Sequence, residues 1–166
     1  MITLIDIKEG KKTSKRRFIL HIILVSILSI LVIGGSIACL LLSKLDYTWN
    51  LILNIAIWAI YIIFMVFYFI NIFPVVSHYY FLFKNMNEVA LEKRRHLTYV
   101  KEIDNRTMSN VVYRVLQFSY KEGENEFVDN LYVLDSDYQF EANKAYKIAT
   151  FRNIIIRSED ISDATI

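Results

Sequence analysis

The sequence predicts a mixed α and β membrane protein, in which a two-helix transmembrane hairpin precedes a small C-terminal β domain. Two apolar runs, residues 18–42 and 49–83, each contain a histidine as their only ionisable side chain apart from tyrosine and cysteine. A bilayer core about 30 Å thick requires roughly 20 apolar residues in a helix, and both runs reach that length. After about residue 96, stretches rich in β-branched and aromatic residues alternate with turn-forming residues, which indicates short strands.

Residues 1–17 form a basic lead, with six Lys and Arg residues against two acidic residues. We expect these side chains to set the orientation of the protein and to lie against anionic lipid headgroups. Ile2, Leu4, Ile5 and Ile7 predict a short strand or an interfacial turn. The expected membrane-surface residues are Lys11, Lys12, Lys15, Arg16 and Arg17 in the lead, with Lys93, Arg94 and Arg95 after the second run.

The flanking charges also predict the topology. The loop Ser43–Thr48 has Lys44 as its only basic residue, whereas both outer flanks carry several. By the positive-inside rule, we expect a multi-pass protein of the cell membrane with both termini in the cytoplasm.

The first run, Phe18–Leu42, is interpreted as a plain transmembrane helix. A signal peptide is the alternative, and the string Ser36–Cys39 weakly resembles a lipoprotein cleavage box. Small residues favour close helix packing, and the six-residue loop makes the second helix the expected partner. A contact between copies of the chain is the alternative for these packing residues, which are Gly34, Gly35 and Ala38.

The second run is too long for one span, because 35 helical residues extend about 52 Å. Pro74 predicts that the span, residues 49–73, ends there, and that residues 75–83 continue at the interface or in the cytoplasm. An apolar stripe then predicts a stalk helix over residues 84–96 that packs on the β domain or the membrane, with a dimerising coiled coil as the alternative. The stripe comprises Val75, Tyr79, Leu82, Met86 and Val89.

Three asparagines, Asn50, Asn54 and Asn71, lie in or near the second span. Polar residues inside a membrane sometimes mark a solute path, but these have no charged partner. We therefore expect them to bond across the helix pair or to lie at the interface.

The β domain is expected over residues 97–158, followed by a flexible tail, residues 159–166. Five short strands predict a small barrel of SH3 or OB type. The best hairpin joins the second and third strands through a polar turn, residues 121–125, and Arg152-Asn153 predicts another turn. The expected strands are residues 97–103, 111–120, 126–134, 145–151 and 154–157.

The sequence contains no pattern typical of catalysis. The histidines His21, His78 and His96 lack metal-ligand spacing, and the four glycines form no phosphate-binding loop. We therefore expect no enzyme activity, metal or cofactor. Cys39 is interpreted as a packing residue. A run of carboxylates, interpreted as a solvated turn rather than a calcium loop, comprises Glu122, Glu124, Glu126 and Asp129. Residues 84–166 carry 12 basic and 14 acidic residues, so we expect no nucleic-acid partner.

Residues 98–159 resemble the DUF3592-like family of small bacterial membrane proteins. The segments that carry the resemblance are TYVKEID, YRVLQFSYKEGENEFVD and YQFEANKAYKIATFRNIIIRSED. The chain departs from the family pattern at Asn143, which replaces a glycine, and at residues 150–153, which replace a Tyr-Asp-Pro-like turn. The resemblance implies two transmembrane helices with a small β domain, and it implies no activity.

These observations predict a protein that acts by binding, as an accessory subunit or interaction module of a membrane complex. Its expected partners are membrane lipids, another membrane protein and, as an alternative, a second copy of the chain. A bacterial immunity protein against a secreted toxin is the alternative function, and an oligomeric channel or transporter component is disfavoured. The expected partner-binding residues are Tyr113, Phe118, Phe127 and Tyr132.

Overall fold

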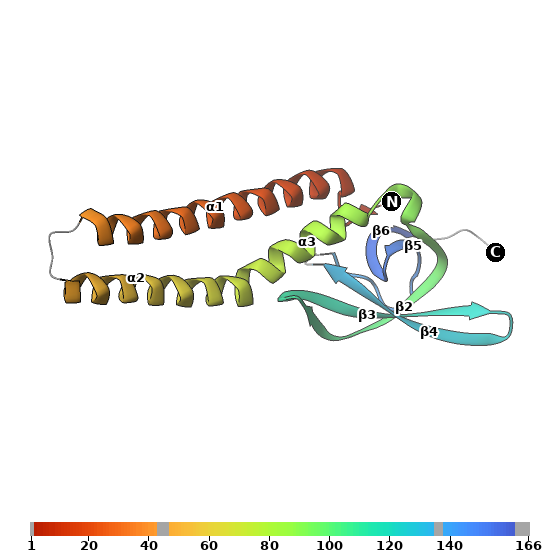
Figure 1. The fold of residues 1–166 in the computed structure, drawn as a ribbon. Coiled ribbons are helices and arrows are strands. Elements are labelled where there is room, and N and C mark those ends of the chain that lie inside the picture. The colour runs from red at the N-terminus through yellow and green to blue at the C-terminus, as the bar shows by residue number, and fades with distance from the viewer. Residues whose placement is uncertain (1, 43–46, 135–137, 162–166) are drawn as a thin grey trace. The chain divides into compact units, whose positions relative to one another are not determined.

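The computed structural model describes residues 2–42, 47–134 and 138–161, and the chain forms two compact units. The helical hairpin consists of Thr13–Tyr80, and the barrel unit combines Met1–Lys12 with Phe81–Ile166. Figure 1 shows long helices in the first and a curled sheet in the second. The predicted mixed α and β composition is confirmed.

The first helix, α1, spans Ile7–Leu42 and therefore includes most of the basic lead. Asp6 caps it, because its Oδ1 accepts hydrogen bonds from the backbone N–H groups of Lys8 at 2.8 Å and Glu9 at 3.0 Å. Of the two expectations for the first residues, the short strand is present as β1, Ile2–Thr3.

The helix of the second run continues past Pro74, as expected for residues 75–83, and the end of the span at residue 73 stays a prediction. α2 (Tyr47–Phe67) continues through the π-helix η1 (Tyr68–Ile72) into α3 (Phe73–Asn85). The backbone N–H of Phe73 bonds to the carbonyl of Tyr68, five residues back. This wider turn makes room for a proline ring that would otherwise clash with the preceding turn.

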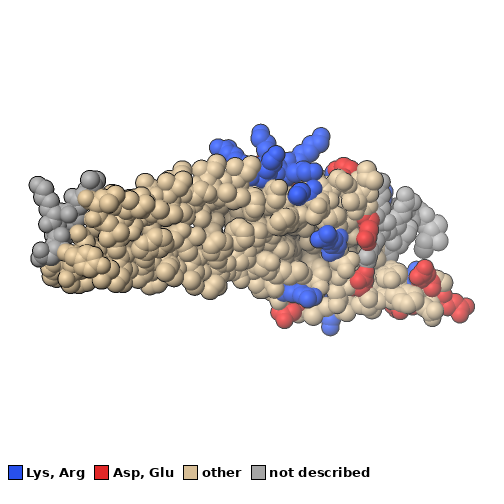
Figure 2. Space-filling view, viewed as in Figure 1, with Lys and Arg blue, Asp and Glu red and all other residues tan. Residues whose placement is uncertain are grey.

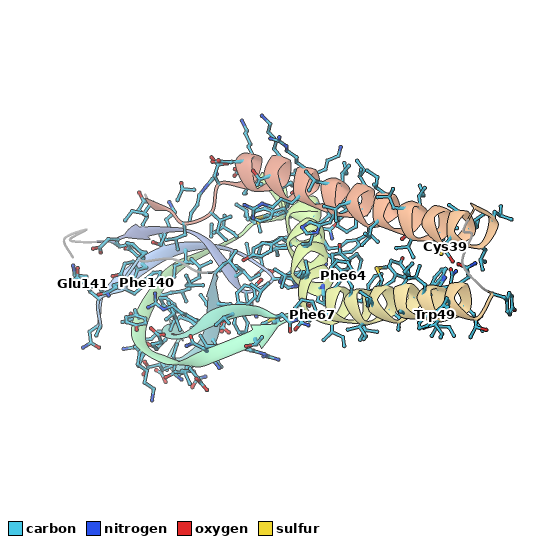
Figure 3. All side chains as sticks on the ribbon, turned by 90° about the vertical axis from the view of Figure 1, so that its left-hand side faces the viewer. Cys39, Trp49, Phe64, Phe67, Phe140 and Glu141 are labelled. Carbon is cyan, nitrogen blue, oxygen red and sulfur yellow. The ribbon has the colours of Figure 1, made fainter. Side chains whose placement is uncertain are left out.

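Both helical segments are long and apolar enough to cross a membrane. They are Ile7–Leu41 and Tyr47–Asn85, and only 6% and 11% of the residues in their most apolar windows are buried. The side chains of α1 and α2 project outward on several sides, as Figure 3 shows around Phe64 and Phe67. The helices therefore have surfaces unlike those of core helices in a globular domain.

The predicted stalk helix, residues 84–96, is wrong beyond Asn85. The side chain of Asn87 accepts a hydrogen bond from the backbone N–H of Ala90 at 2.7 Å, which stabilises a 3₁₀ turn, η2 (Glu88–Ala90), in place of further α-helix. Val89 is 95% exposed whereas Met86 is fully buried, so the apolar stripe does not continue. The strand that follows pairs with another strand from Glu92 onward, and this ladder overrides the local helical pattern.

Five strands close a barrel, as predicted. Their bounds are β2 Glu92–Met108, β3 Val111–Glu122, β4 Asn125–Leu134, β5 Ala145–Phe151 and β6 Ile154–Asp160. β2, β3 and β4 form an antiparallel meander, β5 pairs with β2, and β6 pairs with β5. A parallel pairing of Tyr132 with Ile154 joins β4 to β6 and closes the circuit. β5 has its predicted bounds, whereas β6 extends into the predicted tail as far as Asp160.

Tight turns connect the antiparallel strands. Both central residues have positive φ at Ser109-Asn110 and at Arg152-Asn153, as two-residue hairpins of type I′ require. The second of these turns was predicted. Asn143 also has a positive φ of 63°. Asparagine tolerates this region better than most residues.

The barrel interior is apolar and aromatic. Phe140, labelled in Figure 3, contacts Tyr138, Phe118 and Tyr146 with ring centroids 4.8–5.4 Å apart. The backbone N–H of Glu141 donates to the Tyr146 hydroxyl at 2.9 Å, so the loop before β5 is fixed to this core. The buried cluster comprises Leu97, Tyr99, Leu116, Phe118, Leu131, Val133, Phe140, Tyr146, Ile148 and Ile155.

The segment before α1 belongs to the barrel sheet. Ile2 and Thr3 pair antiparallel with β6, and the backbone N–H of Leu4 donates to Ile156 at 3.0 Å. Further along, a Cβ added to Gly10 would overlap the ring of Phe83. Glycine therefore permits a close approach between the first turn of α1 and the end of α3.

Candidate functional site

The distal part of the β3–β4 hairpin, residues 119–128, is the most exposed strand pair in the described barrel. We call it the β3–β4 arm. Its side chains are half-buried at Ser119 and Tyr120 and exposed from there to Val128. The turn places Gly123 at a φ of 67°, as the first central residue of a type II′ hairpin requires. Because each residue of β4 pairs with β3 without a bulge, the arm is a regular two-stranded ribbon.

Apolar side chains remain exposed on this arm. Phe127 stacks on Tyr120 with ring centroids 5.6 Å apart, and Tyr120 in turn packs against the barrel core. Phe127 is nevertheless 43% exposed and Val128 is 58% exposed. Successive side chains of a strand point to opposite faces, so the arm exposes one apolar side chain on each face.

The tip of the arm is acidic. Glu122, Glu124 and Glu126 are exposed there, with Lys121 as the basic residue among them. Figure 2 shows these acidic side chains gathered at the hairpin end of β3 and β4. The predicted solvated turn is confirmed, and among the described residues no cluster of His, Cys, Asp or Glu could hold a metal ion.

We call the edge of β4 that faces away from β3 its outer edge. This edge pairs with another strand only near the C-terminal end of β4, at Tyr132. The backbone N–H of Tyr132 points away from β3 and donates to the carbonyl of Asn153 at 2.8 Å. N–H groups alternate in direction along an antiparallel strand, so those of Asn130, Val128 and Glu126 also point away from β3. Among the described strands, none pairs with this edge between Asn125 and Val128.

The expected partner-binding residues divide into two groups. Tyr113 and Phe118 are fully buried, so their assignment to a contact surface is wrong; Phe118 lies on the inward face of β3 and forms part of the core. Tyr132 is half-buried, and its hydroxyl accepts a hydrogen bond from Arg106 at 2.9 Å. Phe127 is exposed on the arm. Sequence alternation alone could not show that Phe118 lies in the barrel core whereas Phe127 lies beyond it.

An ion pair joins β2 and β3 near the middle of their ladder. Arg114 binds both carboxylate oxygens of Glu102, with its Nη2 2.7 Å from Oε2. Hydrogen bonding from Arg114 lowers the pKa of Glu102, and its charge acts in the same direction. Arg114 also donates to the carbonyl of Tyr138 at 3.3 Å. No local sequence pattern indicated this pair, because its members lie on different strands.

The predicted membrane-surface residues of the lead lie on one exposed stretch of α1. Lys11, Lys12, Lys15, Arg16 and Arg17 are all exposed, whereas Ser14 is buried. Figure 2 shows these basic side chains gathered over the beginning of α1. The side chains of the other predicted group, Lys93, Arg94 and Arg95, lie outside the described residues.

Polar side chains join the two helices of the hairpin. Ser36 donates to Asn54 Oδ1 and accepts from Trp58 Nε1 at 3.2 Å. About two helical turns earlier in α1, the hydroxyl of Ser29 lies 2.6 Å from that of Tyr61 on α2. The expectation that the asparagines bond across the pair is confirmed for Asn54.

The expected packing face of α1 is wrong for contact with α2. Gly34, Gly35 and Ala38 are exposed, and no atom lies within 4 Å of a Cβ added to either glycine. Ser36 faces the partner helix instead, because its hydroxyl satisfies polar groups that would otherwise be buried without bonds. Packing of the small residues against another copy of the chain stays a prediction.

Comparisons with known proteins give no match: no family model matches the chain, and neither a curated protein nor a solved structure is significantly similar to it.

Proposed function

We propose that this protein is a small integral membrane protein that holds its β barrel at the membrane surface, where the β3–β4 arm binds another membrane protein. Its role is that of an accessory subunit or interaction module, and it acts by binding rather than by catalysis. The observation that carries the proposal is the exposure of Phe127 and Val128 on strands that extend beyond the barrel core.

Lipid is the solvent that suits the helices. Large side chains along both helices are exposed, such as Leu41 at 77% and Ile63 at 70%. Continuous apolar surface of this extent is unfavourable in water. Inside a bilayer the same side chains contact acyl chains, and the bonds of Ser36, Asn54 and Trp58 satisfy polar groups between the helices.

Two independent arguments support a common side for the barrel and the start of the chain. The positive-inside rule assigns the basic stretch of α1 to the cytoplasm. Separately, β1 pairs with β6, so residues before the first helix and residues after the second must share one compartment. A hairpin with two spans satisfies both conditions.

The strand order of the barrel favours the OB type among the two barrel types that the sequence predicted. Its third and fifth strands, β4 and β6, pair in parallel, and this strand order supports the OB type rather than the SH3 type. Many OB barrels bind oligonucleotides, but the acidic side chains of the arm would repel a phosphate backbone. These features support a protein partner, and they are compatible with the proposed DUF3592-like relationship.

Anchoring makes a weak binding surface effective. A domain tethered to the membrane meets membrane partners at a raised effective concentration, so one exposed aromatic and one β-branched side chain can contribute to useful affinity. The basic side chains of α1 would add contacts with anionic headgroups, each worth about 1 kcal/mol.

Affinity capture from membranes in a mild detergent tests the binding role. The full-length protein should recover a larger membrane protein, and Phe127→Asp combined with Val128→Asp should lose it. Val112→Asp is the matched control, because Val112 is also an exposed strand residue, at 53%, but lies outside the arm. Recovery of the chain alone would contradict the accessory role, and recovery of a soluble toxin would favour the immunity alternative.

Cysteine labelling tests the topology. After Cys39→Ala removes the native thiol, Glu124→Cys on the arm should react with an impermeant maleimide only in lysed cells. Lys44→Cys in the connecting loop should react in intact cells. Reaction of the arm in intact cells would contradict the proposed orientation.

A further inference from the structure

We infer that the outer edge of β4 in the β3–β4 arm accepts an extended, basic segment of a partner protein as an additional β strand. This inference rests on the proposed binding function, and it specifies how the partner binds and what its chemistry is. It depends on three properties of the arm: its hydrogen-bonding edge, its exposed side chains and its charge.

The edge continues an interaction that the protein already makes. At Tyr132 the outward N–H of β4 bonds to Asn153, at the start of the parallel contact with β6. Beyond Asn130 on the same edge, Val128 and Glu126 also present outward N–H groups, and no described strand pairs with them. An incoming strand can therefore extend the ladder without disturbing the bonds between β4 and β3.

The side chains on both faces of the edge suit an added strand. Val128 is 58% exposed on one face, and Phe127 is 43% exposed on the other, where it stacks on Tyr120. In strand addition, main-chain hydrogen bonds supply affinity, and alternate side chains of the incoming segment pack on each face. An incoming segment with apolar residues at intervals would cover Val128 or Phe127.

The charge of the arm selects the occupant. Around the exposed edge lie Glu122, Glu124 and Glu126, against Lys121. A second copy pairing edge to edge would bring Glu126 next to acidic residues of its own kind, and like charges placed directly opposite in a sheet are destabilising. The same acidic groups favour a segment in which lysine or arginine alternates with apolar residues. The carboxylates thus protect the edge from self-association while leaving it open to a basic strand.

A peptide titration with the full-length protein in detergent micelles tests this inference. The probe is a short peptide in which lysine and valine alternate. Two control peptides have proline in place of the central valine or glutamate in place of each lysine. The lysine peptide should bind, and it should slow hydrogen exchange at Val128 and Glu126. Neither control peptide should do so.

The matched variants are Val128→Pro and Val128→Ala. Proline removes the outward N–H without removing a bond to β3, and proline is tolerated on edge strands when its missing N–H faces solvent. Loss of the hydrogen bond and the steric effect of the ring should weaken peptide binding by about tenfold or more, whereas alanine keeps the N–H and should weaken it much less. Glu126→Pro is a second variant on the same edge, should Val128→Pro disturb the fold.

Equal weakening by Val128→Pro and Val128→Ala would overturn strand addition, because contacts of the side chain alone would then explain binding. Equal binding of the glutamate peptide would overturn the basic partner. Dimers that pair through β4 in the absence of peptide would show a second copy as the occupant and overturn the inference. If the membrane partner is captured equally by wild type and Val128→Pro, the proposed function holds and only the inference fails.

Discussion

Ser36 on α1 and Asn54 on α2 form a hydrogen bond between two buried side chains that lie 18 residues apart in sequence. Trp58 donates to the same Ser36 hydroxyl, so three side chains from two helices share one polar contact. The contact fixes the rotation of each helix about its own axis, because only one face of each carries these groups.

Removal of this contact should weaken the hairpin. Ser36→Ala should lower the free energy of helix association by about 0.6 kcal/mol, up to about 1.7 kcal/mol, the range measured for hydrogen bonds between transmembrane helices. Unfolding of the full-length protein in bicelles measures the change. Gly34→Ala is the matched control and should be neutral, because a Cβ at this position meets no atom within 4 Å. A larger loss for Gly34→Ala than for Ser36→Ala would contradict this arrangement.

Gly10 should be intolerant of a single added methyl group. Alanine normally stabilises a helix by about 0.5–1 kcal/mol relative to glycine. At this position its Cβ would overlap the buried ring of Phe83, so Gly10→Ala should instead destabilise the barrel unit by about 1–3 kcal/mol. Hydrogen-exchange mass spectrometry of β6 measures the effect. Adding Phe83→Leu to Gly10→Ala should recover part of the loss, and no recovery would indicate another cause.

Phe118 and Phe127 should respond differently to truncation although they belong to the same hairpin. Phe118 is fully buried, and Phe118→Ala should cost about 3–5 kcal/mol of barrel stability. Phe127 is 43% exposed, so Phe127→Ala should cost about 1 kcal/mol or less while reducing partner capture. Denaturant unfolding followed by tyrosine near-ultraviolet circular dichroism distinguishes the two. Similar losses for both variants would mean that the arm is part of the core.

The ion pair of Glu102 and Arg114 should make barrel stability depend on pH in the acidic range. Hydrogen bonding from Arg114 holds the pKa of Glu102 below its ordinary value of 4.5. A carboxyl with a lowered pKa in the folded state stabilises that state above the unfolded pKa, and this contribution is lost as pH falls through the folded pKa. Both side chains are partly exposed, so the contribution is about 0.5 kcal/mol.

Glu102→Gln should therefore lower the melting temperature slightly at neutral pH and give a shallower decline below pH 4.5 than the wild type. Glu124→Gln at the tip of the arm, which has no ion pair among the described residues, is the control. An unchanged acid decline in Glu102→Gln would contradict the role of the pair.

Local sequence patterns were sufficient for much of the barrel. Alternation over residues 145–151 gave β5 its observed bounds, and Arg152-Asn153 forms the predicted turn. These features depend on neighbours in sequence, which is why they were predictable. By contrast, β2 begins at Glu92 because its partner β5 lies far along the chain, and no local signal at residues 92–96 indicated that pairing.

The helical errors have a similar cause. Pro74 was expected to mark the end of the span, but a π turn immediately before it accommodates the proline without a break in the helix. Small residues predicted the packing face of α1, whereas the polar partners of Ser36 on α2 decide which face turns inward. The arm surface could be predicted only in part: Phe127 was named, but the length of the β3–β4 ribbon beyond the core was not.

The pairing of Ile2–Thr3 with β6 also constrains biosynthesis. Translation yields this short strand before either helix, and its partner appears only after both have been made. In the proposed membrane topology, the sheet must therefore wait until insertion of the hairpin is finished. An error in the insertion of one helix would leave the early strand and its late partner on opposite sides of the bilayer, so correct assembly of the sheet would itself report that the membrane segments were placed correctly.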